Sequence, residues 1–177
     1  NLIQEASIIY DSGELHSSLY QHDAALACFR QSLEIAERIH DESGKSFCYD
    51  AIGDNYFKRG QYAEAKATYE SNLLLQQRIN DREGIAHTFG NLGNIAKMDK
   101  DWDLSREYYN KQLEILAEVG DLDGSGRAWF NLAMIDLETS LKADARNKLE
   151  QALDLFTRCD ASYYIEITRE QIRALDQ

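Results

Sequence analysis

Three asparagines are the residues whose type and spacing best suit a chemical task. Asn91 and Asn94 lie three positions apart, and Asn131 follows further along the chain. A carboxamide both donates and accepts hydrogen bonds, so a row of them can bind the backbone of an extended peptide whatever its sequence. The alternative is that the amides bond to neighbouring helices and hold the fold together, because shielded amides need partners in either case. The sequence leaves both interpretations open.

Metal-binding and catalytic patterns are missing from the sequence. The four histidines occur singly, without the spacing of a zinc site on one helix face. The segment 121–126 resembles the start of a calcium loop, but Leu132 stands where such a loop needs its last glutamate. We find no phosphate loop, no nucleophile elbow, and no set of nucleophile, base and orienting group. The sequence therefore predicts a protein that is not an enzyme and that uses no metal or cofactor.

A fixed sequence period organises the chain. The pair Asp41 and Gly44 recurs at positions 81 and 84 and again at 121 and 124, so the period is forty positions without slippage. In a second motif, Gly53 recurs as Gly93 and then as Ala133, and Asn91 recurs as Asn131. A constant period in the range of about 20–50 residues indicates an array of structural repeats.

Each period divides into two predicted helices. In the repeat 41–80, the first helix begins after Asp41, whose carboxylate can accept the unpaired amide hydrogens of the first turn, and ends near Lys58. Gly60 suits the left-handed residue that often ends a helix. The second helix covers about 62–79, where large apolar residues recur with a helical period.

Small residues mark where the two helices of a repeat pack closely. They recur in the first helix and again in the second, where the series is Ala25, Ala65, Ser105 and Ala145. Small side chains let antiparallel helices approach one another while large neighbours fill the grooves. Gly93→Leu is therefore expected to destabilise more than Gly120→Ala, unless Gly120 has a positive φ.

This combination of small residues, with an aromatic residue four positions after the small residue of the second helix, resembles the tetratricopeptide repeat (TPR) family. The long form of the repeat, with Asp-x-x-Gly, is similar to that of Pins-type adaptors, kinesin light chains and bacterial Rap-type regulators. The resemblance implies an all-α fold, a right-handed α-solenoid of antiparallel helix pairs. It implies a single array over residues 1–177, with repeats at about 1–40, 41–80, 81–120 and 121–160 and a capping helix at 161–177.

By the same resemblance, the protein is a non-catalytic scaffold that binds a peptide or helical segment in a concave groove lined by the first helices. Phe47, Phe57, Phe130 and Met134 could form apolar pockets there or belong to the core. The candidate binding residues are Asp50, Asp54, His87, Asn91, Asn94, Lys97, Arg127 and Asn131. Two alternatives stay open: a regulatory or sensor module of a larger signalling ATPase, protease or kinase, and a self-associating array.

Charge and cysteine content limit the possible partners. The net charge of −12 disfavours nucleic acid and anionic membrane surfaces and favours a basic protein or peptide. Three scattered cysteines do not form a disulfide framework and are typical of a cytoplasmic protein. No apolar run approaches the roughly 20 residues of a membrane-spanning helix. The chain already reads as helix in its opening residues, so we expect it to be cut from a longer protein.

Overall fold

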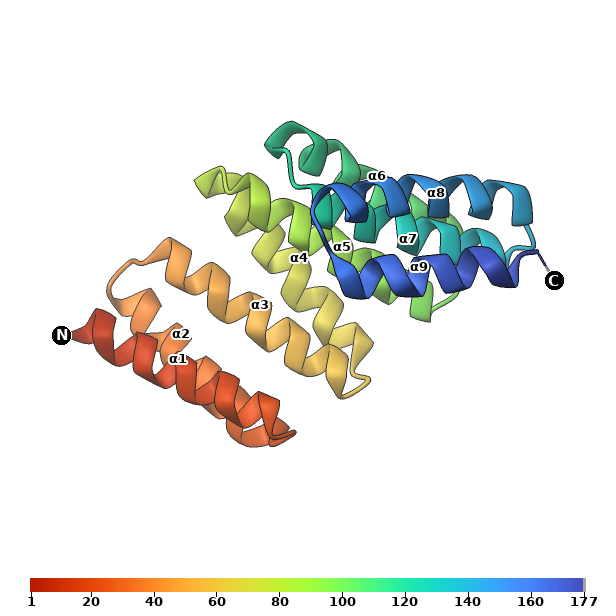
Figure 1. Cartoon of the computed structure of the whole chain (residues 1–177). Helices are drawn as coiled ribbons and strands as arrows, with labels where there is room; N and C mark the ends of the chain where they lie inside the picture. The colour runs from red at the N-terminus through yellow and green to blue at the C-terminus, as the bar shows by residue number, and fades with distance from the viewer. Residues whose placement is uncertain (177) are drawn as a thin grey trace. The chain divides into compact units, whose positions relative to one another are not determined.

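The computed structural model describes residues 1–176, and all regular secondary structure in this range is helical (Figure 1). The helices are α1 (Leu2–Ser18), α2 (His22–Arg38), α3 (Glu42–Lys58), α4 (Tyr62–Ile79), α5 (Arg82–Met98), α6 (Trp102–Val119), α7 (Leu122–Glu138), α8 (Lys142–Arg158) and α9 (Ser162–Ala174). Their bounds follow the predicted helix pairs closely. Within the described range, no helix has both the length and the apolarity needed to cross a bilayer.

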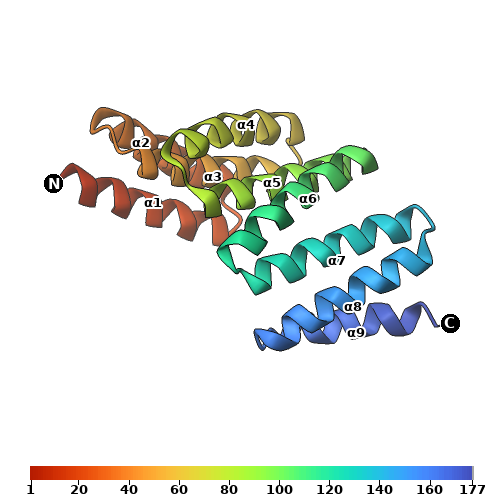
Figure 2. The ribbon, with the colours of Figure 1, turned by 90° about the horizontal axis from the view of Figure 1, so that it is seen from above.

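The chain divides into two compact units, Asn1–Gly84 and Ile85–Gln177. In the first unit α1 packs on α2, α2 on α3 and α3 on α4, and α1 also touches α3. In the second unit α6 packs on α7, α7 on α8 and α8 on α9, and these successive helices run antiparallel (Figure 2). Each unit therefore has the layered helix pairs that the repeats predict. The single array over residues 1–177 stays a prediction.

A left-handed residue closes each of the eight turns between the described helices. These residues follow one another at regular intervals: Tyr20, His40, Gly60, Asn80, Lys100, Gly120, Ser140 and Asp160. The next residue bonds back into the helix, as Asp41 N does to Ala36 O at 2.9 Å. This is the Schellman arrangement, which satisfies the last carbonyls of a helix. The left-handed conformation predicted for Gly60 is confirmed, with φ of 73°.

The repeated aspartate caps the first helix of its repeat. Asp41 Oδ1 accepts the backbone N–H of Gly44 at 2.9 Å, and the same contact recurs in each of the next two repeats. A Cβ on Gly44 would lie 2.5 Å from Asp41 Oδ2, which explains the glycine. The first repeat lacks this motif, but Asn1 caps α1 by accepting the N–H of Ile3 at 3.2 Å. The predicted N-caps are confirmed.

The small residues of the first helices pack against large rings of the second helices. Each glycine faces an aromatic ring of the following helix: Gly13 with Phe29, Gly53 with Tyr69 and Gly93 with Tyr109. In the fourth repeat Ala133 and Leu149, both fully buried, take these two positions. A Cβ on Gly93 would lie 2.9 Å from the ring of Tyr109, so the predicted close approach of the helices is confirmed.

Candidate binding face

The candidate residues lie on the first helices of successive repeats. Asp50 and Asp54 belong to α3 in the first unit, and the other six belong to α5 and α7 in the second unit. Residues three or four positions apart share one side of a helix, so each helix presents its candidates together. In each unit, the side of the first helices that carries these positions is called the A-helix face.

In the second unit two asparagine oxygens are engaged by donors from other helices. Asn94 Oδ1 accepts a hydrogen bond from Tyr109 Oη at 2.6 Å, and Asn131 Oδ1 accepts one from Lys97 Nζ at 3.2 Å. The first contact joins α5 to α6 and the second joins α5 to α7. Since Tyr109 is fully buried, the structure supports the alternative, fold-holding interpretation for Asn94. The proposed ligand contacts of Asn91 and Asn131 stay predictions.

Lys97 is the half-buried cation of this face. Burial lowers the pKa of its ammonium group below the ordinary value, because a charged group loses hydration there. Its hydrogen-bond partner Asn131 is neutral and offers no charge in compensation. The pair places a strong donor and an amide from two helices side by side on a partly exposed surface.

His87 and Arg127 occupy exposed positions at the beginning of α5 and α7. Arg127 Nε lies 3.2 Å from Asp123 Oδ2, one helical turn earlier. Both side chains are about half exposed, and an ion pair at such a surface position adds little stability. A negatively charged partner group could therefore compete for the guanidinium at small cost.

In the first unit the two aspartates bond to the second helix of their own repeat. Tyr69 Oη donates to Asp54 Oδ1 at 2.5 Å, and Gln76 Nε2 lies 3.5 Å from Asp50 Oδ2. The charges of the same carboxylates also act on Tyr10 of α1. Its pKa is raised first by burial and then by negative charges that include both aspartates. The charge of Glu14 on α1 acts on Tyr10 in the same direction.

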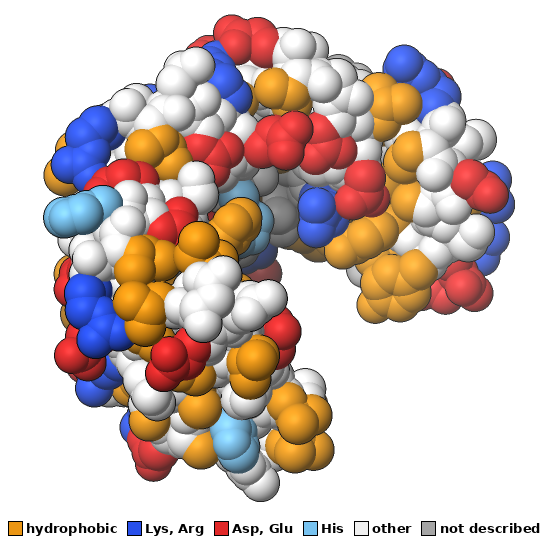
Figure 3. Space-filling view, turned by 90° about the vertical axis from the view of Figure 1, so that its left-hand side faces the viewer, with side chains coloured by type: hydrophobic (Ala, Val, Ile, Leu, Met, Phe, Trp, Pro, Cys, Tyr) orange, Lys and Arg blue, Asp and Glu red, His pale blue; other side chains and the backbone are white. Residues whose placement is uncertain are grey.

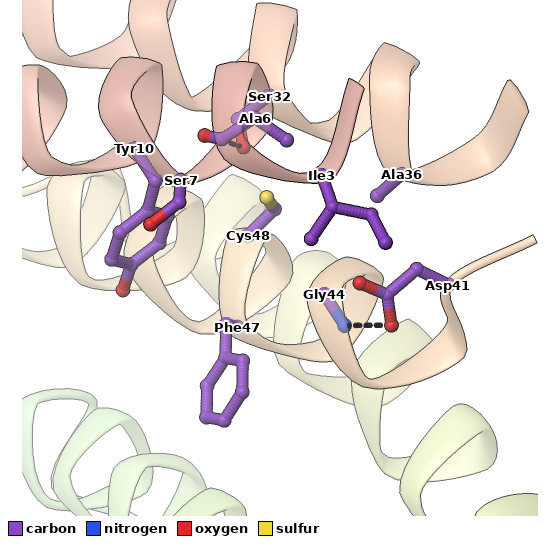
Figure 4. Close-up of a pocket in the computed structure, with 10 residues that line it drawn as sticks. All are labelled: Ile3, Ala6, Ser7, Tyr10, Ser32, Ala36, Asp41, Gly44, Phe47 and Cys48. Carbon is purple, nitrogen blue, oxygen red and sulfur yellow. Dashed lines mark hydrogen bonds between the residues drawn. The ribbon is translucent and has the colours of Figure 1, made fainter. Parts of the chain in front are cut away.

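A cavity of about 390 Å³ opens between α1 and α3 and was not expected (Figure 4). Its lining residues are Ile3, Ala6, Ser7, Tyr10, Ser32, Ala36, Asp41, Gly44, Phe47 and Cys48. Of these, Phe47 is the residue that the sequence predicts for an apolar pocket. Ser7 lies one full repeat before Phe47, so the repeat period places these two residues at equivalent positions of α1 and α3.

Charged and hydrophobic side chains are mixed on the face drawn in Figure 3. Figure 3 shows acidic side chains, drawn red, next to hydrophobic ones, drawn orange, on the side of the molecule that faces the viewer. The net charge of the sequence is −12. The expectation that nucleic acid is not a partner rests on this charge.

A family model described as tetratricopeptide repeat matches residues 4–73 and 84–158, which is most of the chain. The chain belongs to the tetratricopeptide repeat family. This TPR assignment agrees with the turns, the caps and the packing of small residues on aromatic rings described above. None of the curated proteins matches the chain.

Solved structures share the TPR fold at low sequence identity. BtubC (BKLC) from P. vanneervenii has a TM-score of 0.77 and 15% identity, over 99% of this chain and 81% of that one. Aspartyl phosphate phosphatase F from Bacillus subtilis has a TM-score of 0.91 and 14% identity, over 96% and 44%. The signal transduction ATPase (STAND) protein with a tetratricopeptide repeat sensor from Pyrococcus horikoshii has a TM-score of 0.84 and 17% identity, over 95% of this chain and 26% of that one.

These similarities confirm the predicted all-α solenoid of TPR type. At such identities they show the fold alone. The TPR chain spans less than half the length of the phosphatase and of the STAND protein. The family is an interaction module, and the match indicates no catalytic family.

Proposed function

We propose that this chain is a non-catalytic scaffold that binds a peptide or a helical segment of another protein on its A-helix face. The observation that carries the proposal is the hydrogen bond between Lys97 Nζ and Asn131 Oδ1. It sets polar groups from α5 and α7 side by side on a half-exposed surface, as recognition of a peptide backbone requires. His87 and Arg127 extend the same surface toward the beginning of both helices.

The partner in this proposal is basic. The net charge of −12 raises the rate of association with a cationic peptide, and salt screens that attraction. Asp50 and Asp54 supply local negative charge in the first unit. Neither nucleic acid nor a membrane surface is a partner in this proposal, and the chain works in the cytoplasm without a cofactor.

Catalysis is not part of the proposed function. One structural neighbour is named a phosphatase, but the shared segment is 44% of that protein and the identity of 14% shows the fold alone. Among residues 1–176, no group of three or more His, Cys, Asp or Glu side chains could hold a metal ion. The family match points to interaction rather than to a reaction.

A second candidate function is a sensor module within a larger signalling enzyme. The STAND neighbour favours it, because that protein is described as having a tetratricopeptide repeat sensor and this chain spans 26% of it. In this case the A-helix face would bind the signal, and the activity would lie outside the described residues. The sequence that flanks the chain in its parent gene distinguishes the two functions.

The test is affinity capture with the immobilised chain, followed by mapping of the bound segment. Asn91→Ala combined with Asn131→Ala is the test variant, and Asn110→Ala, at an exposed position of α6, is the matched control. We expect the double variant to lose the partner and the control to keep it. A partner that binds both variants equally, or that maps to residues 161–176, would show that the A-helix face is not the site.

A further inference from the structure

The cavity between α1 and α3 exists because its floor carries small side chains. Ser32 and Ala36 of α2 are almost fully buried at its base. The same register positions hold Gln112 and Leu116 in α6, two repeats later. A Cβ on Gly90 would meet Gln112 Nε2 at 2.6 Å, so this longer side chain extends across the space beside α5.

The second floor position shows the same difference. A Cβ on Gly124 would lie 3.1 Å from Leu116 Cδ2, whereas a Cβ on Gly44 would lie 3.5 Å from Ala36 Cβ. The leucine therefore approaches the next helix more tightly, whereas the alanine is at ordinary van der Waals distance from it. At these two floor positions the first unit therefore carries smaller side chains than the second unit.

The rim of the cavity is exposed and apolar. Ile3 and Phe47 are 61% and 62% exposed, while Cys48 on the floor is 1% exposed. Figure 4 shows Phe47 on the α3 side and the sulfur of Cys48 between the two helices. Burial raises the pKa of the Cys48 thiol, so the floor stays uncharged. At about 390 Å³ the cavity is near the small end of ligand pockets, which span about 300–1,000 Å³.

Carboxylates flank this apolar hollow. Tyr10 lines the cavity, and the charges of Glu14, one turn further along α1, and of Asp50 and Asp54 of α3 act on its hydroxyl group. Glu14 lies two helical turns beyond Ser7, and Asp54 lies two turns beyond Phe47. At about 1.5 Å per helical residue, the carboxylates lie about 10 Å from the middle of the cavity.

We propose that the cavity binds one large apolar side chain of a peptide, and that the adjacent carboxylates bind a lysine or arginine of the same peptide. An extended chain advances about 3.3 Å per residue, so a span of about 10 Å places the basic residue about three positions from the apolar one. The partner is therefore a peptide with an apolar anchor and a nearby cation. This proposal rests on the proposed function, since it names the ligand of the A-helix face in the first unit.

The test begins with a random-peptide display selection on the wild-type chain. Selected peptides are synthesised with a fluorophore, and their affinities are measured by anisotropy for three proteins. Ala36→Leu fills the floor with the residue that α6 carries at this register. Ala27→Leu adds the same bulk at an exposed position of α2 and is the control. Circular dichroism verifies the fold, and Phe47→Ala, at an exposed residue, replaces Ala36→Leu if that variant unfolds.

We expect the selected peptides to share an apolar residue with Lys or Arg two to four positions away. Ala36→Leu should weaken their binding at least tenfold, and Ala27→Leu by less than twofold. Glu14→Gln should weaken binding and reduce its salt dependence, because it removes one attracting charge. Peptides without this pair of residues, or an equal affinity for Ala36→Leu, would overturn the proposal, as would a selection that yields no binder.

The two proposals fail in different ways. If the peptides bind Ala36→Leu fully but lose affinity for Asn91→Ala with Asn131→Ala, the cavity is not the anchor site and the proposed function stands. If neither variant changes the binding, the ligand lies away from the A-helix face and both proposals fail.

Discussion

Tyr109 Oη donates a hydrogen bond of 2.6 Å to Asn94 Oδ1, and this contact ties the second helix of a repeat to its first. The first unit repeats it as Tyr69 Oη to Asp54 Oδ1. The two acceptors occupy equivalent positions of successive repeats and differ in type, whereas the donor is a buried tyrosine in both units. The shared feature is therefore an acceptor at a fixed place on the A-helix face, and this place serves the fold.

Removing that acceptor should destabilise the protein. Asn94→Ala leaves the buried hydroxyl of Tyr109 without this partner, at a cost of about 1–3 kcal/mol. Tyr109→Phe should cost less, because the half-exposed amide of Asn94 can bond to water instead. Urea denaturation of both variants measures the difference. Equal stabilities for Asn94→Ala and the wild type would show that the contact contributes nothing.

A double variant of Asn91 and Asn131 distinguishes a role in ligand binding from a role in the stability of the fold. If Asn91 and Asn131 recognise a ligand, Asn91→Ala with Asn131→Ala abolishes binding while the melting temperature hardly changes. If the amides hold the helices together, the melting temperature falls, because Lys97 loses its Asn131 partner, and binding weakens only as the fold fails. Both quantities are measured on one double variant, by anisotropy and by calorimetry.

Two glycines test the register of the repeats. Gly93→Leu forces a side chain against the Tyr109 ring and should cost about 1–3 kcal/mol or more through overpacking. Gly120 has a positive φ, of 76°, which is the exception named for the sequence prediction. An alanine in this conformation is strained, so Gly120→Ala should also destabilise the protein, by about 1 kcal/mol. Thermal melts should still rank Gly93→Leu as the less stable variant. The reverse ranking would contradict the assigned helix contact.

Glycine substitutions at two of the left-handed turn residues should make the protein more stable. Lys100 and Ser140 have φ of 59° and 63°, a conformation that costs most residues about 1–2 kcal/mol. Glycine removes this cost, but it loses more conformational entropy when the chain folds, which lowers the stability by about 0.5–1 kcal/mol. Lys100→Gly and Ser140→Gly should each stabilise by up to about 1 kcal/mol in urea titrations. Asn80→Gly is the control and should change little, because asparagine tolerates this conformation.

Alkaline pH should unfold the protein through its buried tyrosines. Burial, and then the charge of Asp54, raises the pKa of Tyr69 above its ordinary value of 10.0, and burial also raises that of Tyr109. The folded state keeps protons that the unfolded state loses above about pH 10, so this stability is present below about pH 10 and is lost as the pH rises further. Tyr69→Phe should lessen the decline. Urea midpoints at about pH 9 and about pH 11 test it.

The helices and their caps could be predicted because each signal occurs several times in the sequence. Asp41 with Gly44, and Gly53 with its later equivalents, mark the same events in each period. The turns were harder to predict. Local preference points to Gly60, yet Tyr20 and His40 adopt the same left-handed conformation, because the packing of the paired helices outweighs the local cost.

The site was less predictable, because side-chain partners depend on the distances between helices. Asn94 and Asn131 look alike in the sequence, but one accepts from a buried tyrosine and the other from a lysine. The cavity depends on the small size of the side chains of Ser32 and Ala36. A hollow has no residue pattern of its own, and only comparison with the larger side chains of another repeat shows it.

The layered contacts have a consequence for how the chain folds. Within each unit the main contacts join helices that are neighbours along the chain, with smaller contacts between α1 and α3 and between α5 and α7. Proteins dominated by such local contacts have low contact order and fold on time scales of about microseconds to milliseconds. Each further helix pair can add to the repeats already folded, because it packs mainly on its neighbours. Folding speed should therefore change little when the order of the repeats along the chain is altered.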